Sequence, residues 1–241
     1  MKNFLQISLL SIALVGCSSI DYAELSSPIS PSKTQIDRII ALNLSHTESL
    51  KEANKLMDPV LVSTVVKALE ARKLKADNAT IEAENVAIYA EMVEVSDDNL
   101  KFVGSKISEI KKRNMIGNPE NFDYFLLGSK DKSDGSIQHK LNFSITYTSS
   151  EKRNYSSASY CDKWDGCDSE NLMDIALISS KASGCNSYEC NYNEIIELNL
   201  DDDFLRSNME EDFSVSVNSK EANNKITFTS PYLKGYLSVA Y

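Results

Sequence analysis

The spacing of apolar residues changes once along this chain of 241 residues, near Asn118-Pro119, and this change most constrains the fold. Before it, apolar side chains recur every three or four residues, as from Ile36 to Ile40, which is the period of an amphipathic helix. After it, apolar and polar residues alternate, as in KLNFSITYT at 140–148, which is typical of a strand with one buried face. We therefore predict an α+β fold, with a helical region over 34–118 and a β-rich domain over 119–241.

The helical region contains a seven-residue repeat. Asp58-Pro59 first predicts a helix start, because the carboxylate can cap the helix and a proline at its first position loses no hydrogen bond. The repeat begins at Leu74, and its five first positions are Leu74, Ile81, Ile88, Val95 and Phe102. Such a heptad predicts a coiled coil, and small apolar residues between these positions predict a second packed face on the same helix.

A β interpretation of residues 74–107 stays open, because Val86, Ile88 and Ala90 alternate like one side of a strand. The high content of Ala, Glu and Lys and the absence of glycine before Gly104 favour a helix. Ser96 and the two aspartates after it predict the cap of a further helix that runs through Ile110.

The β-rich domain contains about seven short β-prone runs separated by polar turns. The runs are DYFLLGS, KLNFSITYTS, NLMDIALISS, NEIIELNL, FSVSVNS, KITFTS and LKGYLSVAY. They predict an antiparallel β-sandwich or an open barrel, with cysteine-bearing insertions at one end. Asp201 and the two aspartates after it follow a strand and predict the cap of a short helix through Leu205.

The first 17 residues carry a recognisable pattern: Lys2, an apolar stretch from Phe4 to Val15, and the run Leu14-Val15-Gly16-Cys17. This order of cationic, apolar and small residues before a cysteine resembles the signal peptide and lipobox of bacterial lipoproteins. The resemblance implies that residues 1–16 are removed, that Cys17 is lipidated with fatty acyl chains such as palmitate, and that Ser18 directs the protein to the outer membrane. The alternatives are an ordinary secretory signal peptide and an uncleaved membrane helix, but the stretch is shorter than the roughly 20 residues that a spanning helix needs.

Residues 17–33 follow as the lipidated cysteine and a tether, because the segment SSIDYAELSSPISPSK combines serine and proline with few apolar residues. We expect this tether to stay extended and to hold the folded part away from the membrane. The side of the outer membrane that the folded part faces, periplasmic or surface, stays open.

The four remaining cysteines, Cys161, Cys167, Cys185 and Cys190, lie within 30 residues. Export through the cell envelope exposes them to an oxidising compartment, so two disulfides are expected. Three pairings are open, and the short separations favour Cys161 with Cys167 and Cys185 with Cys190. A zinc site of four thiolates is the alternative, but these spacings are wider than is usual for zinc.

The formal net charge of −10 argues against nucleic acid as a partner. Lys111-Lys112-Arg113 is the strongest candidate for a site that binds a polyanion. Positive charge is favourable at the C-terminal end of a helix, and we expect the run to have that role instead. The same acidity opposes electrostatic adhesion to anionic lipid, so the acyl chains are expected to attach the protein to the membrane by themselves.

Catalytic motifs are missing, and we predict a protein that is not an enzyme and has no cofactor. His46 and His139 are far apart in sequence, and neither belongs to a zinc-protease or Ser-His-Asp pattern. Asp162, Asp165 and Asp168 surround a cysteine pair and form a weak calcium candidate, although their spacing does not match an EF-hand loop.

Trp164, Tyr160 and Tyr188 lie close to the cysteines, where a rigid loop can present aromatic area for recognition. The structural alternative is that Trp164 covers its own disulfide. We therefore expect an envelope lipoprotein with a structural role or a role in recognising a protein or glycan. The alternatives are a coiled-coil scaffold that forms homo-oligomers through the heptad segment and, third, an envelope hydrolase that uses carboxylates.

Overall fold

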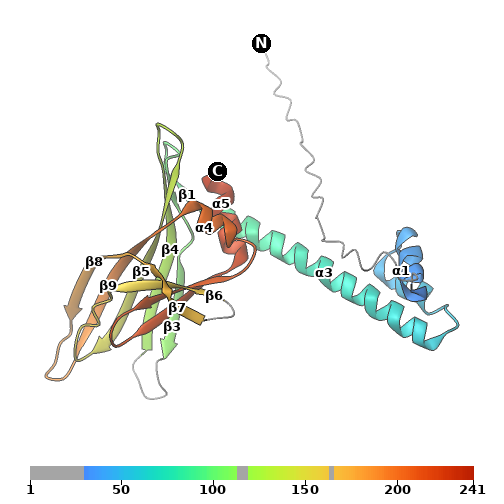
Figure 1. Cartoon of the computed structure of the whole chain (residues 1–241), viewed down its shortest axis with the longest axis horizontal. Coiled ribbons are helices and arrows are strands. Elements are labelled where there is room, and N and C mark those ends of the chain that lie inside the picture. The colour runs from blue at the N-terminus through green and yellow to red at the C-terminus, as the bar shows by residue number, and fades with distance from the viewer. Residues whose placement is uncertain (1–29, 113–118, 163–165) are drawn as a thin grey trace, which may run out of the picture. The chain divides into compact units, whose positions relative to one another are not determined.

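The computed structural model describes residues 30–112, 119–162 and 166–241, and for Lys112, Cys161, Asp162 and residues 166–172 it describes the backbone alone. The chain divides into two compact units, Met1–Ala76 and Asp77–Tyr241, and the boundary lies within helix α3 (Figure 1). We call them the helical unit and the β unit. In the described part of the chain, no helix is long and apolar enough to cross a membrane.

The helical unit contains α1 (Pro31–Ala41), α2 (His46–Ala53) and the first half of α3 (Pro59–Glu91). Ile39, Ala53, Val65 and Leu69 form its small buried core. The predicted start of α3 is confirmed, because the Asp58 carboxylate accepts the N–H groups of Val60 at 2.8 Å and Leu61 at 3.3 Å. The predicted tether extends too far, since α1 begins at Pro31 rather than at Thr34. A proline at the first helical position explains this, because it favours a helix start.

The heptad is helical only as far as Glu91. Leu74, Ile81 and Ile88 lie on α3, but Val95 lies on strand β1 (Glu94–Val95) and Phe102 on β2 (Lys101–Val103). The prediction of a helix through Ile110 is wrong. The Ser96 hydroxyl accepts the N–H of Lys101 at 2.9 Å, and Asn99 takes the left-handed conformation with φ of 56°. These residues form a hairpin turn instead of a helix cap, because serine, aspartate and asparagine serve both structures.

The β unit contains two antiparallel sheets. The larger has seven strands in the order β1, β2, β4, β5, β9 and β8, with β3 paired to β4, and the smaller has the order β11, β10, β6, β7. The larger sheet comprises β1 (Glu94–Val95), β2 (Lys101–Val103), β3 (Ile107–Lys112), β4 (Pro119–Lys130), β5 (Ile137–Ser149), β8 (Ile175–Ser183) and β9 (Cys190–Leu200). The smaller comprises β6 (Ser157–Asp162), β7 (Gly166–Met173), β10 (Phe213–Asn218) and β11 (Asn223–Phe228). The predicted α+β class with antiparallel pairing is confirmed.

One hydrophobic core joins the two sheets. Along β4 and β5, buried and more exposed residues alternate, as the sequence predicts. Tyr124 of the larger sheet meets Phe228 of the smaller sheet edge to face, with ring centroids 5.3 Å apart. Both residues are at least 99% buried, so this aromatic contact lies in the interior of the β unit.

Two helices complete the β unit: α4 (Asp202–Ser207) and α5 (Ser230–Ala240). The prediction for α4 is confirmed, because the Asp201 carboxylate accepts the N–H of Phe204 at 3.1 Å. The prediction of a last strand at LKGYLSVAY is wrong, because this segment lies in α5 up to Ala240. Pro231 lies in the first turn of this helix, where a proline loses no hydrogen bond. The buried residues follow the helical period and include Tyr232, Leu233, Tyr236, Leu237 and Ala240.

α5 packs against the second half of α3 (Figure 1). Tyr232 meets Tyr89 with ring centroids 5.3 Å apart, and Lys234 forms an ion pair with Glu82 at 2.7 Å. At the closest approach, Gly235 leaves room for the α3 backbone at Val86 and Ala90. The predicted second face of this helix, made of small residues, is therefore used to pack α5.

Candidate functional site

Several predicted site residues lie where the structure says nothing of their side chains. These are Cys17, Cys161, Asp162, Trp164, Asp165, Cys167 and Asp168. The lipidation site, the weak calcium candidate and the tryptophan therefore stay predictions. For the cysteine pair, the backbone places Cys161 on β6 directly opposite Cys167 on β7.

The structure confirms a disulfide between Cys185 and Cys190, with an S–S distance of 2.08 Å. It shows one disulfide among the described side chains, where the sequence predicted two. The prediction that both cysteine pairs sit in insertions at one end is wrong: Cys161 and Cys167 lie within strands of the smaller sheet, whereas the Cys185–Cys190 loop joins β8 and β9 of the larger sheet.

The two described aromatic residues of the predicted recognition surface differ in environment. Tyr188, inside the disulfide loop, is 86% exposed. Tyr160 lies on β6, half-buried, where its ring meets Phe204 edge to face at 5.1 Å and its hydroxyl donates to Asn208 at 2.8 Å. Tyr160 thus helps to pack the smaller sheet, and Tyr188 alone of this pair is presented to solvent.

A polar hollow of about 620 Å³ borders the disulfide loop. Its lining includes the uncharged polar side chains of Asn121, Thr146, Thr148, Ser183, Asn186 and Asn191. Glu189 is the one ionisable carboxylate among these described lining residues. Asn186 also shapes the loop, because its side-chain oxygen accepts the N–H groups of Tyr188 at 2.8 Å and Glu189 at 2.9 Å.

A buried network supports the hollow from within the β unit. The Tyr147 hydroxyl donates to Glu194 at 2.8 Å and accepts the backbone N–H of Arg153 at 2.9 Å. Burial, and then the neighbouring Glu194, raise the pKa of Tyr147, so its hydroxyl stays protonated and continues to donate. Tyr147 is 1% exposed and stacks on Tyr192, which holds this part of β5 rigidly.

At the other end of β5, His139 forms a buried hub that sequence reasoning did not find. Its Nδ1 lies 3.0 Å from the Tyr236 hydroxyl and its Nε2 lies 3.2 Å from Asp202. Since a carboxylate only accepts, we assign the ring proton to Nε2, and Tyr236 donates to Nδ1. These partners are 63 and 97 residues away in sequence, so no local spacing could have indicated them.

We expect the stability of the protein to fall at acidic pH because of His139. Burial lowers the pKa of this histidine below its ordinary 6.5, although Asp202 opposes the shift. The contribution is complete above about pH 6.5 and is lost as the pH decreases, because only the unfolded chain then takes up the proton; the slope is at most about 1.4 kcal/mol per pH unit. Urea unfolding near pH 5.5, 6.5 and 7.5 measures it. His139→Gln should remove the slope, and equal slopes in both proteins would contradict the assignment.

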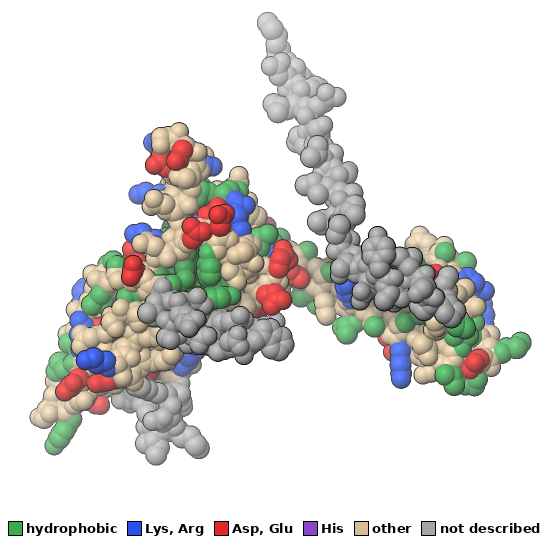
Figure 2. Space-filling model, viewed as in Figure 1, with side chains coloured by type: hydrophobic (Ala, Val, Ile, Leu, Met, Phe, Trp, Pro, Cys, Tyr) green, Lys and Arg blue, Asp and Glu red, His purple; other side chains and the backbone are tan. Residues whose placement is uncertain are grey.

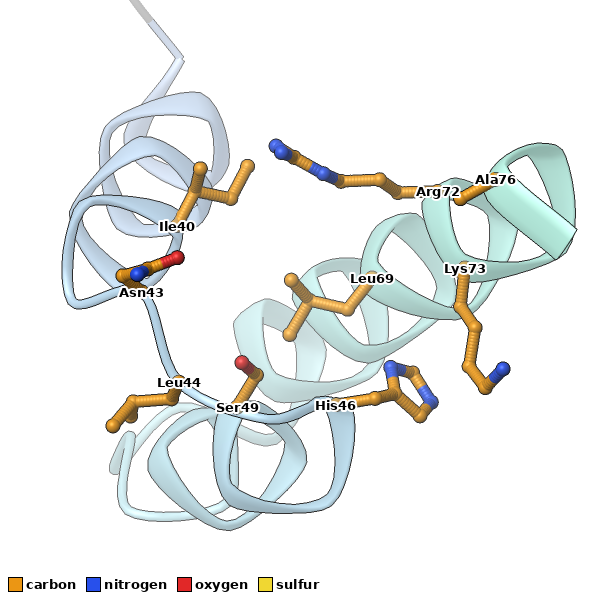
Figure 3. A pocket seen from close by; sticks show the side chains of 9 residues that line it. All are labelled: Ile40, Asn43, Leu44, His46, Ser49, Leu69, Arg72, Lys73 and Ala76. Carbon is orange, nitrogen blue, oxygen red and sulfur yellow. The ribbon is translucent and has the colours of Figure 1, made fainter. Parts of the chain in front are cut away.

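The helical unit has a pocket of its own, of about 240 Å³, between the end of α1, the start of α2 and α3 (Figure 3). Leu69 points into it from α3 and is 5% exposed, and Ile40 faces it from α1. Arg72 extends from α3 towards the side of Ile40, and Lys73 extends towards His46 on α2 (Figure 3). The pocket thus combines an apolar floor with a cationic rim.

No protein-family model matches this chain, and no curated protein matches it. In the part of the chain that the structure describes, no group of three or more His, Cys, Asp or Glu side chains is placed to hold a metal ion. The polar hollow of the β unit, the pocket of the helical unit and the exposed side chains around them are the features that bear on function.

Proposed function

We propose that the protein is a lipoprotein of the outer membrane, anchored through Cys17, whose β unit recognises a glycan. The lipobox resemblance supports the anchor. The register of β6 and β7 supports a second disulfide, because Cys161 and Cys167 are directly opposite each other on neighbouring strands. That bond would link β6 to β7 in the smaller sheet. The disulfide between Cys185 and Cys190 closes the loop between β8 and β9 in the larger sheet in a similar way.

The composition of the polar hollow carries the proposal for recognition. Asparagine side chains offer both donors and acceptors, and hydroxyls such as Thr148 do the same, which matches the neutral hydroxyl groups of a sugar. Tyr, Ser, Gly and Asn are also the residues that adaptable binding loops favour. Tyr188 lies in sequence between two lining residues, Asn186 and Glu189, and its exposed aromatic ring would contact a glycan that extends out of the hollow.

Replacing Tyr188 should weaken glycan binding without changing the fold. For Tyr188→Ala we expect at least a tenfold loss of affinity, about 1.4 kcal/mol, for purified peptidoglycan or for polysaccharide released from the host's outer membrane. The unfolding curve should not move, because the side chain is 86% exposed.

Ile178→Ala is the matched control, since this residue is 53% exposed on β8 and does not line the hollow. Equal binding by the wild-type protein and Tyr188→Ala would contradict the proposal. If neither polysaccharide binds and an envelope protein binds in a way that depends on Tyr188, the hollow is a protein-binding site.

A scaffold role is the second candidate, and the exposed face of α3 in the β unit favours it. Ile81 and Ile88 are 54% and 53% exposed and follow the heptad spacing, while a different face of α3 packs on α5. Asn85 lies between the two isoleucines, and an asparagine in such a seam is known to select the register of paired helices.

If α3 pairs with a second copy, the full chain carrying Cys17→Ser should sediment as a dimer. Ile81→Gln with Ile88→Gln should then give a monomer, because each substitution removes an apolar side chain from the seam. Ala87→Gln, on another exposed side of α3, should leave the dimer intact. A monomeric parent at micromolar concentration would remove the scaffold role.

A further inference from the structure

The two units carry opposite charge. Residues 30–76 contain eight Lys and Arg against five Asp and Glu, a net charge of +3, whereas residues 77–241 carry −12. Figure 2 shows Lys and Arg side chains on the surface of the helical unit. The formal charge of the whole chain therefore hides a basic unit, and the expectation that acidity keeps the protein from anionic lipid does not apply to this unit.

The pocket of the helical unit concentrates this charge over an apolar floor. Arg72 and Lys73 are neighbours on α3, and both line the pocket together with Leu69. No carboxylate of the described residues lies within ion-pairing distance of Arg72. Its guanidinium has the planar donors that suit a phosphate group.

We propose that this pocket binds the phosphate-bearing headgroup of an anionic phospholipid. The phosphate would contact the Arg72 guanidinium on the rim, and Lys73 would add positive charge on the opposite side of the pocket. The start of the acyl chains would lie on Ile40, Leu44 and Leu69. The hollow is large enough for a headgroup but too small for a whole lipid, so the chains must remain in the bilayer.

The choice of lipid as the occupant rests in part on the anchor proposed above. Residues 17 and 31 are fourteen positions apart, and a chain of this length reaches at most about 50 Å. A lipidated Cys17 would therefore hold the helical unit close to the headgroups, where even a weak pocket is filled because the local lipid concentration is high.

The test measures vesicle binding by the full-length chain with Cys17→Ser, which cannot be acylated. Vesicles of phosphatidylcholine with one third phosphatidylglycerol are compared with vesicles of phosphatidylcholine alone. We expect binding only to the anionic vesicles, and at least a tenfold loss of affinity for Arg72→Gln with Lys73→Gln. Lys67→Gln with Lys75→Gln is the matched control, since it removes the same charge from α3 outside the pocket lining. Circular dichroism verifies that each variant folds.

Each result decides between clear alternatives. Equal losses in the two double variants would mean general electrostatic adhesion and would overturn the pocket proposal, as would absence of binding. Direct binding of inorganic phosphate at millimolar concentration, with no binding to vesicles, would identify a soluble phosphate ligand and overturn the lipid. Intact mass of the wild-type protein after thiol alkylation reports the anchor and the second disulfide separately, so a failed anchor is distinguishable from a failed pocket.

Discussion

Arg153→Met should lower the free energy of unfolding by about 3–5 kcal/mol, the largest loss that we expect from one substitution in this protein. Arg153 is 5% exposed, forms an ion pair with Glu120 and donates to the Tyr155 hydroxyl at 3.1 Å. Burial opposes its charge, but the hydrogen bonds to Glu120 and Tyr155 keep its pKa above the ordinary value. Without Arg153, the Glu120 carboxylate stays buried without a counter-charge. Urea unfolding followed by circular dichroism measures the loss.

The cause of this loss can be separated from the lost packing of a long side chain. Arg153→Met with Glu120→Leu should recover most of the stability, because no unpaired charge is then buried. Lys140→Met removes a cation from the exposed pair with Glu197 and should cost less than about 1 kcal/mol. If the double variant is as unstable as Arg153→Met alone, the buried charge is not the reason for the loss.

Gly235→Val should cost about 3 kcal/mol or more, because it prevents α5 from packing against α3. A Cβ atom at this position would lie 2.7 Å from Cβ of Tyr89, 2.8 Å from the carbonyl oxygen of Val86 and 2.9 Å from the nitrogen of Ala90. Two of these atoms belong to the backbone, so no change of side-chain rotamer relieves the contact. Thermal and urea unfolding of the variant check this value.

Ser238→Val is the matched control for Gly235→Val. It places the same β-branched side chain on α5 at an exposed position and should change the stability by less than about 1 kcal/mol. Similar losses for the two variants would show that helix propensity, and not the contact with α3, determines the effect.

The proposed functions place different tasks on the two units. The basic pocket of the helical unit would hold the protein against anionic lipid, and the polar hollow of the acidic β unit would remain available for a glycan. Net charge computed over the whole chain obscured this division, because the −12 of the β unit outweighs the +3 of residues 30–76.

Elements whose signals are local could be predicted well. The start of α3 behind Asp58 and of α4 behind Asp201 depends on a carboxylate next to the helix that it caps. The alternation along β4 and β5 reflects one buried face of a sheet. Prediction failed where local chemistry allows two structures, as at Ser96, whose hydroxyl closes a turn, and in α5, where apolar residues suit a helix as well as a strand.

The candidate sites were harder to predict, because they combine residues that are distant in sequence. The pocket of the helical unit joins His46 to Arg72 and Lys73, and the polar hollow joins Asn121 to Asn191. The aromatic and cysteine content of residues 160–190 predicted recognition near the disulfide loop, and Asn186 and Glu189 of this loop line the hollow. The recognition itself stays a prediction. This content did not show that Tyr160 is half-buried and packs against the core.

The sequence by itself determined that helical structure comes before antiparallel β structure and favoured the disulfide between Cys185 and Cys190, because these signals depend on residues that are near each other in the chain. It placed the change near residue 119, whereas the first strand of the structure begins at Glu94. Only the tertiary structure decided the contacts of His139 with Asp202 and Tyr236, the ion pair of Arg153 with Glu120 and the fit of Gly235 against α3. The residues in each contact are far apart in the sequence, so no local pattern indicates them. Burial strengthens these contacts because it excludes water.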